Sequence, residues 1–112
     1  MNYKIMIHEF EGPLDLLLHL IKESDIEILD ISVEEITKQY MDYIDAMEEL
    51  NLNIASEYLV MAAELLEMKS RELLPRKKQE LEDDYEEDPK ARLIERLLEY
   101  KRYKEVTPEL KE

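Results

Sequence analysis

The chain offers few side chains for catalysis or metal binding, because it contains two histidines and no cysteine. His19 follows Asp15 by four residues, so on a helix the two side chains would share one face. A carboxylate and an imidazole at this spacing could hold a metal ion only with further ligands from elsewhere, and no second histidine follows at helical spacing. We interpret Asp15 and His19 as a solvated pair, and His8 as a residue that faces solvent or a pairing segment.

Other patterns that support catalysis are missing. A single glycine cannot build a phosphate-binding loop, and there is no G-x-S-x-G nucleophile motif. Carboxylates are abundant, but no apolar pocket frames a pair of them for general acid catalysis. The lack of cysteine excludes disulfides and thiol chemistry. We expect a protein that is not an enzyme and that uses no cofactor, metal ion or small-molecule substrate.

The composition also limits the partners. At 112 residues the chain suits one domain with a modest core. Its 29 acidic and 15 basic residues leave a formal net charge of -14, which would repel the phosphates of nucleic acid. No apolar run approaches the ~20 residues of a membrane span, and the first residues do not resemble a signal peptide. We expect a cytoplasmic protein that contacts other proteins and no membrane.

The pattern predicts a mostly α fold, a small helical bundle with one short strand, because turn-forming residues are sparse. Residues 3–8 alternate apolar and polar side chains and predict the strand. It would pair either with residues 26–31, the only local candidate, or with the sheet edge of another protein. Pro108 should end the last helix. The expected helices are three main ones, at 13 to about 24, 33–50 and about 54–74, and a fourth from 89 to about 103.

Two helix starts carry clear capping signals. Gly12 should be the N-cap of the first helix, with Pro13 at the first helical position and Asp15 in the first turn, where its charge meets the helix dipole. Ser32 and Glu35 form an S-x-x-E capping box at the start of the second helix. These five residues are predicted to be structural.

A charged segment divides the chain. Residues 76–88 contain seven acidic side chains and almost nothing to bury, which indicates a linker between a domain at 1–75 and a segment at 89–112. Within residues 90–104 the charge changes sign, and basic side chains accompany an apolar stripe. We interpret this helix as a docking site for an acidic protein surface, although an ordinary surface helix would show a similar pattern.

The third helix carries more apolar surface than one core requires. Its apolar residues cover roughly 220° of the circumference at ~100° per residue, whereas a helix on one core shows a stripe nearer ~100°. One stripe comprises Ile54, Tyr58, Met61, Ala62 and Leu65, and a second comprises Leu59, Ala63, Leu66 and Leu73. Either a compact three-helix bundle buries both stripes, or a partner helix covers the second one. We favour the partner, with the first helix as the central rib of the bundle.

Three stretches, in order, closely resemble the N-terminal half of the bacterial segregation and condensation A proteins, the kleisin subunits of SMC condensin complexes. They are FEGPLDLLLHLI at 10–21, DIEILDISVEEITKQYMDYI at 25–44 and NIASEYLVMAAELLEMKSRELLP at 53–75. The similarity extends through the acidic linker to ERLLEYKRYK at 95–104.

The resemblance implies that the N-terminal helical domain binds the coiled-coil neck above the ATPase head of one SMC protomer. It also implies that the region after the linker binds a dimer of segregation and condensation protein B (ScpB). A winged-helix domain missing from this chain would bind the other head. The resemblance further implies that the protein is nucleoid-associated and contacts DNA only through the complex. The candidate neck-binding residues are Tyr58, Leu59, Ala62, Ala63, Leu66, Ser70 and Leu73. The candidate dimer-binding residues are Leu93, Arg96, Leu97, Tyr100, Lys101 and Arg102.

Three other functions compete with this interpretation. A self-associating helical adaptor would pair its apolar face with a copy of itself and would not bind SMC. A nucleic-acid adaptor would use residues 90–104 and would show salt-dependent DNA binding. A helical carboxylate metalloenzyme is remote, because the chain has no paired Glu-x-x-His motifs.

Overall fold

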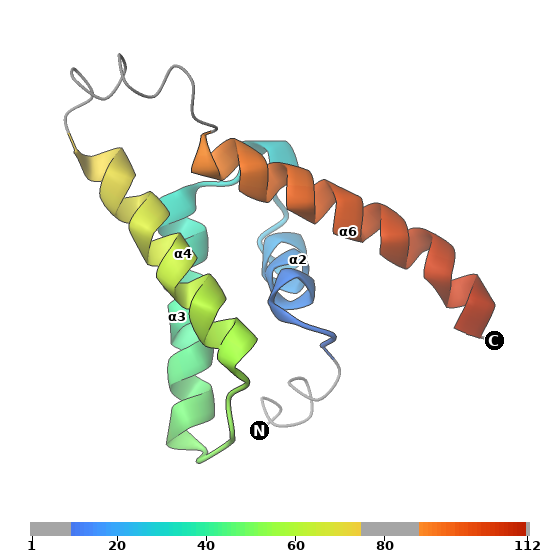
Figure 1. The fold of residues 1–112 in the computed structure, drawn as a ribbon, viewed down its shortest axis with the longest axis horizontal. Coiled ribbons are helices and arrows are strands. Elements are labelled where there is room, and N and C mark those ends of the chain that lie inside the picture. Colours follow the sequence, from blue (N-terminus) through green and yellow to red (C-terminus); the bar gives the residue numbers. More distant parts are fainter. Residues whose placement is uncertain (1–9, 75–87, 112) are drawn as a thin grey trace.

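The fold was analysed in a computed structural model, which describes residues 10–74 and 88–111, with side chains as far as residue 106. Within these residues the structure is mostly α, as the sequence predicts (Figure 1). The predicted strand at residues 3–8 lies outside the described part of the chain. The elements are α2 (Pro13–Glu23), the short 3-10 helix η1 (Ile28–Asp30), α3 (Val33–Glu49), α4 (Ser56–Leu73) and α6 (Pro89–Lys111).

Three helices form the centre of the bundle. α3 and α4 run in opposite directions side by side, and α2 packs beside them (Figure 1). Leu16 and Leu17 of α2 are fully buried, and so are Tyr40 of α3 and Leu65 of α4. The leucines of α2 therefore form the predicted central rib, because they lie where α3 and α4 can both pack against them.

Both predicted helix starts are confirmed. Gly12 is the N-cap of α2, with Pro13 in the first turn, and the Gly12 carbonyl accepts a hydrogen bond from the Leu16 amide at 3.1 Å. Ser32 is the N-cap of α3, and its Oγ accepts a hydrogen bond from the Glu35 amide at 3.2 Å. The Ser32 side chain satisfies an amide that the first turn of a helix leaves unpaired, whereas Gly12 accepts the first hydrogen bond of the helix through its backbone.

α2 and α3 end in the same way. Asp25 and Asn51 have φ angles of 59° and 60°, in the left-handed region. After α3, the Leu52 amide donates to the Met47 carbonyl at 3.1 Å, and the bonds after α2 follow the same pattern. This is the Schellman motif, in which one left-handed residue lets the chain reverse over the last turn of the helix.

The structure does not support the local pairing candidate for the strand, and the predicted end of the last helix is wrong. Residues 26–31 contain η1 and do not form a strand, because the Asp30 amide donates to the Glu27 carbonyl at 2.9 Å and closes a local turn. Pro108 does not end the last helix, which continues to Lys111. Proline removes only one backbone hydrogen bond there, close to the end of the helix.

The position of α6 was not predicted. The helix crosses α2 and contacts η1 (Figure 1). Leu93 and Leu97 are 1% and 0% exposed, and they belong to the same hydrophobic core as α2, α3 and α4. In this conformation the helix after the acidic segment is part of the folded bundle.

Candidate protein-interaction site

α4 presents two apolar faces, of which the bundle covers one. The inner face consists of Tyr58, Met61, Ala62, Leu65 and Met68, all buried. On the opposite side Leu59 is 47% exposed, Leu66 46% and Leu73 73%. α2 and α3 pack against the inner side. Within residues 10–74 and 88–111 no helix covers the second stripe, so this part of the chain does not form a bundle that buries both stripes.

Two buried hydrogen bonds fix the rotation of α4 about its axis. The Tyr40 hydroxyl donates to the Tyr58 carbonyl at 2.8 Å, and Thr37 Oγ1 donates to the Leu65 carbonyl at 3.4 Å. Burial raises the pKa of the Tyr40 hydroxyl well above its ordinary value, and the nearby Tyr58 and acidic side chains add to the effect. Tyr40 therefore remains a neutral donor, and the outer stripe stays turned away from the core.

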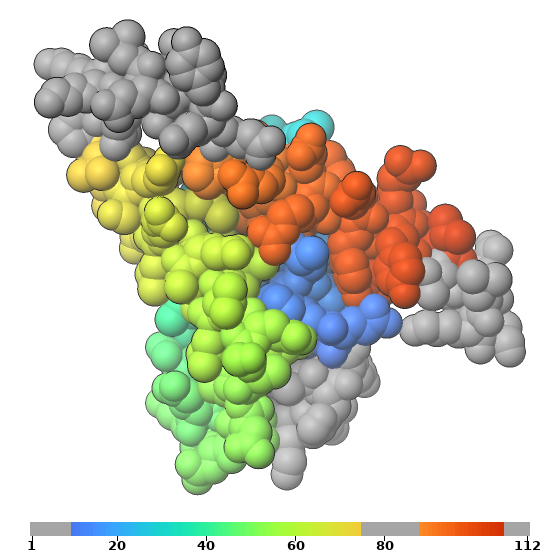
Figure 2. Space-filling view, in the orientation of Figure 1, coloured from blue at the N-terminus to red at the C-terminus, as the bar shows by residue number. Residues whose placement is uncertain are grey.

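The outer face of α4, defined here as Leu59, Ala63, Leu66, Ser70 and Leu73, alternates large and small side chains. All five are exposed. In Figure 2 the yellow-green surface of α4 is open toward the viewer, and no other described helix crosses in front of it. Small residues between leucines produce hollows beside ridges, the surface into which another helix can pack.

The structure separates the seven predicted neck-binding residues into two groups. Tyr58 and Ala62 are each 7% exposed and belong to the core, while the other five form the outer face. The sequence analysis missed Val60, which is 56% exposed and borders the outer face. The sequence could have indicated Val60, because it is an apolar residue next to Leu59 that belongs to neither apolar stripe.

The predicted dimer-binding residues of α6 are also divided between two sides. Leu93 and Leu97 are buried in the common core, whereas Lys101 and Arg102 are exposed. Tyr100 lies at the edge of the contact and is partly buried. The inner face of α6, defined as Leu93, Leu97 and Tyr100, is therefore already occupied within the chain.

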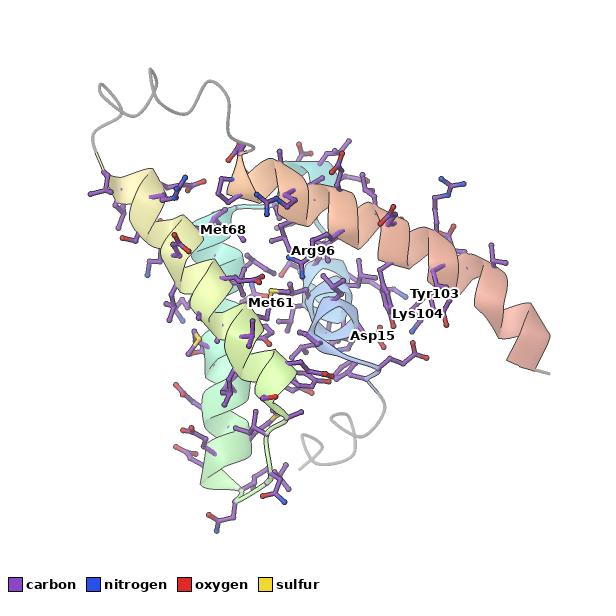
Figure 3. The ribbon with its side chains drawn as sticks, viewed as in Figure 1. Asp15, Met61, Met68, Arg96, Tyr103 and Lys104 are labelled. Carbon is purple, nitrogen blue, oxygen red and sulfur yellow. The ribbon has the colours of Figure 1, made fainter. Side chains whose placement is uncertain are left out.

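Arg96, Tyr100 and Lys104 connect α6 to the rest of the bundle through polar contacts. These contacts join Arg96 Nη1 to Glu64 Oε1 at 3.2 Å, the Tyr100 hydroxyl to Glu11 Oε1 at 2.6 Å, and Lys104 Nζ to Asp15 Oδ1 at 3.1 Å. Figure 3 shows Lys104 directed from α6 toward Asp15 at the start of α2. In each contact α6 supplies the donor and the rest of the bundle supplies a carboxylate. The acidic surface expected to meet this helix is, in this conformation, the chain's own.

Asp15 does not form the solvated pair predicted with His19. Its side chain is 8% exposed, and its two carboxylate oxygens accept from Lys104 and from the Glu11 amide, the latter at 3.0 Å. His19 Nε2 instead lies 3.5 Å from Glu23 Oε2. The prediction was wrong because it did not foresee α6, whose lysine makes burial of this carboxylate possible.

Residues 10–74 and 88–111 were considered for two other kinds of site, a metal centre and a membrane-spanning helix. They contain no group of three or more histidine or carboxylate side chains that could hold a metal ion. No helix within these ranges is both long enough and apolar enough to cross a bilayer. The outer face of α4 remains an exposed apolar surface within the described structure.

The fold and this face define a small α-helical domain that presents one apolar helix surface without a partner. Residues 20–112 match the family described as Segregation and condensation protein ScpA, and the chain belongs to this family.

Relatives in three bacteria agree with this assignment. The segregation and condensation protein A of Oceanobacillus iheyensis is 60% identical over 115 residues, which cover 99% of this chain and 45% of that protein. The proteins of that name from Bacillus cytotoxicus and Bacillus cereus (strain Q1) are 55% and 54% identical over all of this chain and 46% and 47% of their own length. The chain therefore spans a little under half the length of these relatives.

Proposed function

We propose that this chain is the N-terminal part of a non-enzymatic kleisin subunit, acting in chromosome condensation and segregation, and that the outer face of α4 binds the coiled-coil neck of an SMC ATPase. One observation carries the proposal: Leu59, Leu66 and Leu73 are exposed along one side of a helix whose other side is fully packed. Membership of the segregation and condensation protein A family supports the same function.

The energetics of the face suit a helical partner. Burying an exposed leucine contributes roughly 1.5–3 kcal/mol, and a half-exposed leucine retains part of that amount. Burial of three such leucines along one helix would therefore favour binding of a partner helix even if the interface is small. A net charge of -14 on the chain also favours a neck surface that is neutral or basic near the contact.

The proposed division of labour leaves the chemistry to the partner. The SMC ATPase would hydrolyse ATP, while this chain would restrict how the ATPase heads separate. Contact with DNA would be indirect, through the assembled complex, and the protein would act in the cytoplasm at the nucleoid. Residues 89–112 would begin the region that binds a ScpB dimer, with Lys101 and Arg102 exposed beside the contact.

The first test is size-exclusion chromatography with light scattering, applied to the chain alone and mixed with an SMC head-and-neck fragment. We expect a monomer alone and a one-to-one complex in the mixture. A dimer that does not exchange for the SMC fragment would support the self-associating adaptor instead. A monomer in both samples would contradict the proposal.

A second test concerns the dimer-binding half of the proposal. Replacing both Lys101 and Arg102 by glutamate should weaken binding to a purified ScpB dimer, because an acidic partner surface would then meet like charge. Binding to the SMC neck should not change, since neither side chain belongs to α4. Equal dimer affinity in a titration would contradict this half alone.

A further inference from the structure

Over residues 89–106, the part of α6 whose side chains the structure describes, the inner face is the main apolar stripe, and the chain itself covers it. Leu93 and Leu97 are buried in the core that α6 shares with α2 and the other helices, whereas Leu98 is 38% exposed among charged residues. A partner that binds α6 through apolar contacts would gain most from the inner face. It could reach that face only if α6 left α2.

From this geometry we propose that the docking of α6 on α2 is an autoinhibitory contact, and that partner binding and docking exclude each other. The inference rests on the proposed function, since the partner it regulates is the dimer assigned to residues 89–112. The bundle shows what that partner must offer, an apolar groove bordered by carboxylates, because this is what α6 contacts now.

The contact has the composition of a separable interface. Arg96 and Glu64 are each 40% exposed, the Lys104 side chain is 41% exposed, and the hydrogen bond between Tyr100 and Glu11 is exposed as well, so solvent reaches all three of these polar contacts. Interfaces between parts of one chain that move relative to each other are more polar than a core, and exposed ion pairs contribute little. Among the described side chains α6 contributes two residues to the buried core, Leu93 and Leu97, whereas α2, α3 and α4 each contribute at least four, so α6 is the helix most easily released.

The covalent connection between α4 and α6 favours docking of α6 over binding of an external partner. A segment joined to its binding site by a short connection experiences an effective concentration on the order of mM. The apparent affinity of an external partner falls in proportion to the fraction of molecules in which α6 is free. Weakening only the bundle side of the contact should therefore strengthen partner binding, without altering a single residue of α6.

The test uses substitutions on the bundle side alone. The variant carries Glu11→Gln, Asp15→Asn and Glu64→Gln, which remove the three carboxylates and keep the size of each side chain. The matched control carries Asp45→Asn, Glu48→Gln and Glu49→Gln, three exposed residues of α3 away from α6. We expect the variant to bind a purified ScpB dimer roughly tenfold more tightly than the control. Affinity equal to or below that of the control would overturn the proposal.

A distance measurement tests the same inference without disturbing the contact. Because the sequence contains no cysteine, Asp42→Cys on α3 and Glu99→Cys on α6 allow two spin labels at exposed positions. Electron paramagnetic resonance should give one docked distance in the free chain, and that distance should disappear at saturating dimer. A docked distance that persists in the complex would overturn autoinhibition and leave the proposed function intact. Absence of dimer binding by every variant would instead refute the partner assignment itself.

Discussion

The outer face of α4 and the inner face of α6 have similar apolar patterns in the sequence, but in the folded chain one is exposed and the other is buried. Both are apolar stripes at helical spacing, and both were predicted to bind partners. The structure leaves Leu66 of α4 at 46% exposure and buries Leu97 of α6 completely. The difference shows that an apolar stripe alone does not identify a partner site.

What separates the two helices is the amount of apolar surface. α4 carries two stripes, and the bundle needs only the one that includes Leu65. α6 carries a single main stripe, which packs on α2. A surplus over what the core can cover, rather than the presence of apolar residues, marks the face that remains open.

The largest predicted effect separates the two faces of α4. Leu65→Ala should lower the free energy of unfolding by about 2–4 kcal/mol, because Leu65 is fully buried and its removal leaves a cavity. Leu66→Ala, on the outer face, should cost less than about 1 kcal/mol. Urea unfolding followed by circular dichroism measures both. Similar losses would mean that the outer face is also packed in solution.

The second prediction applies the same comparison to α6. Leu97→Ala should cost about 2 kcal/mol, and Leu98→Ala less than about 1 kcal/mol, since only Leu97 lies in the core. Hydrogen exchange should show that Leu97→Ala exposes the amides of α6 while α3 and α4 keep their protection. Loss of protection in all helices together would contradict a separable α6.

The third prediction concerns the hydrogen bond that orients α4. Tyr40→Phe should cost about 1 kcal/mol at neutral pH, because the Tyr58 carbonyl loses its donor. Burial raises the pKa of Tyr40 in the folded chain above the value near 10 that it has when unfolded. The stability that the protonated Tyr40 hydroxyl contributes is complete below pH 10. It is lost as the pH rises further, at up to about 1.4 kcal/mol per pH unit.

Unfolding free energies measured from pH 8 to pH 11 test that sign. The wild type should lose stability above pH 10, and Tyr40→Phe should reduce the slope. Tyr100→Phe is the comparison at the edge of α6, where burial and the hydrogen bond to Glu11 also raise the tyrosine pKa. An unchanged slope in Tyr40→Phe would show that this hydroxyl is not protected from ionisation.

The smallest predicted effect is a gain. Asp25→Gly should stabilise the chain by about 0.5–1 kcal/mol, because φ is 59° at this position and glycine adopts that conformation without strain. The substitution also removes a negative charge near the C-terminal end of α2. The same urea assay measures it, and a loss of stability would mean that the Asp25 side chain makes an essential contact.

The helices were predictable because their signals are local. Gly12, Pro13 and Ser32 act on the backbone next to them, and the residue before Pro75 marks the end of α4. The outer face of α4 was also predictable, since the arc of apolar residues is a property of one helix. Tyr58 and Ala62 were included in the site because the arc does not say where the bundle edge falls.

The contacts of α6 could not be predicted in the same way. Asp15 and Lys104 are 89 residues apart, and nothing in their local sequence links them. The charge of 90–104 did indicate an acidic surface as its neighbour, but the sequence did not show that Glu11, Asp15 and Glu64 provide it. Long-range pairing depends on the arrangement of the helices, which residue spacing alone does not define.

The central claim is that the outer face of α4 binds the SMC neck, and one titration tests it most directly. Leu66→Glu is compared with Leu50→Glu, because Leu66 and Leu50 are 46% and 49% exposed but Leu50 lies at the end of α3. Both variants should keep the helicity of the wild type by circular dichroism. We predict that Leu66→Glu weakens binding to an SMC head-and-neck fragment at least 100-fold while Leu50→Glu binds normally, consistent with roughly 3 kcal/mol for a charge placed in an apolar contact. Unchanged neck affinity in Leu66→Glu would contradict the account.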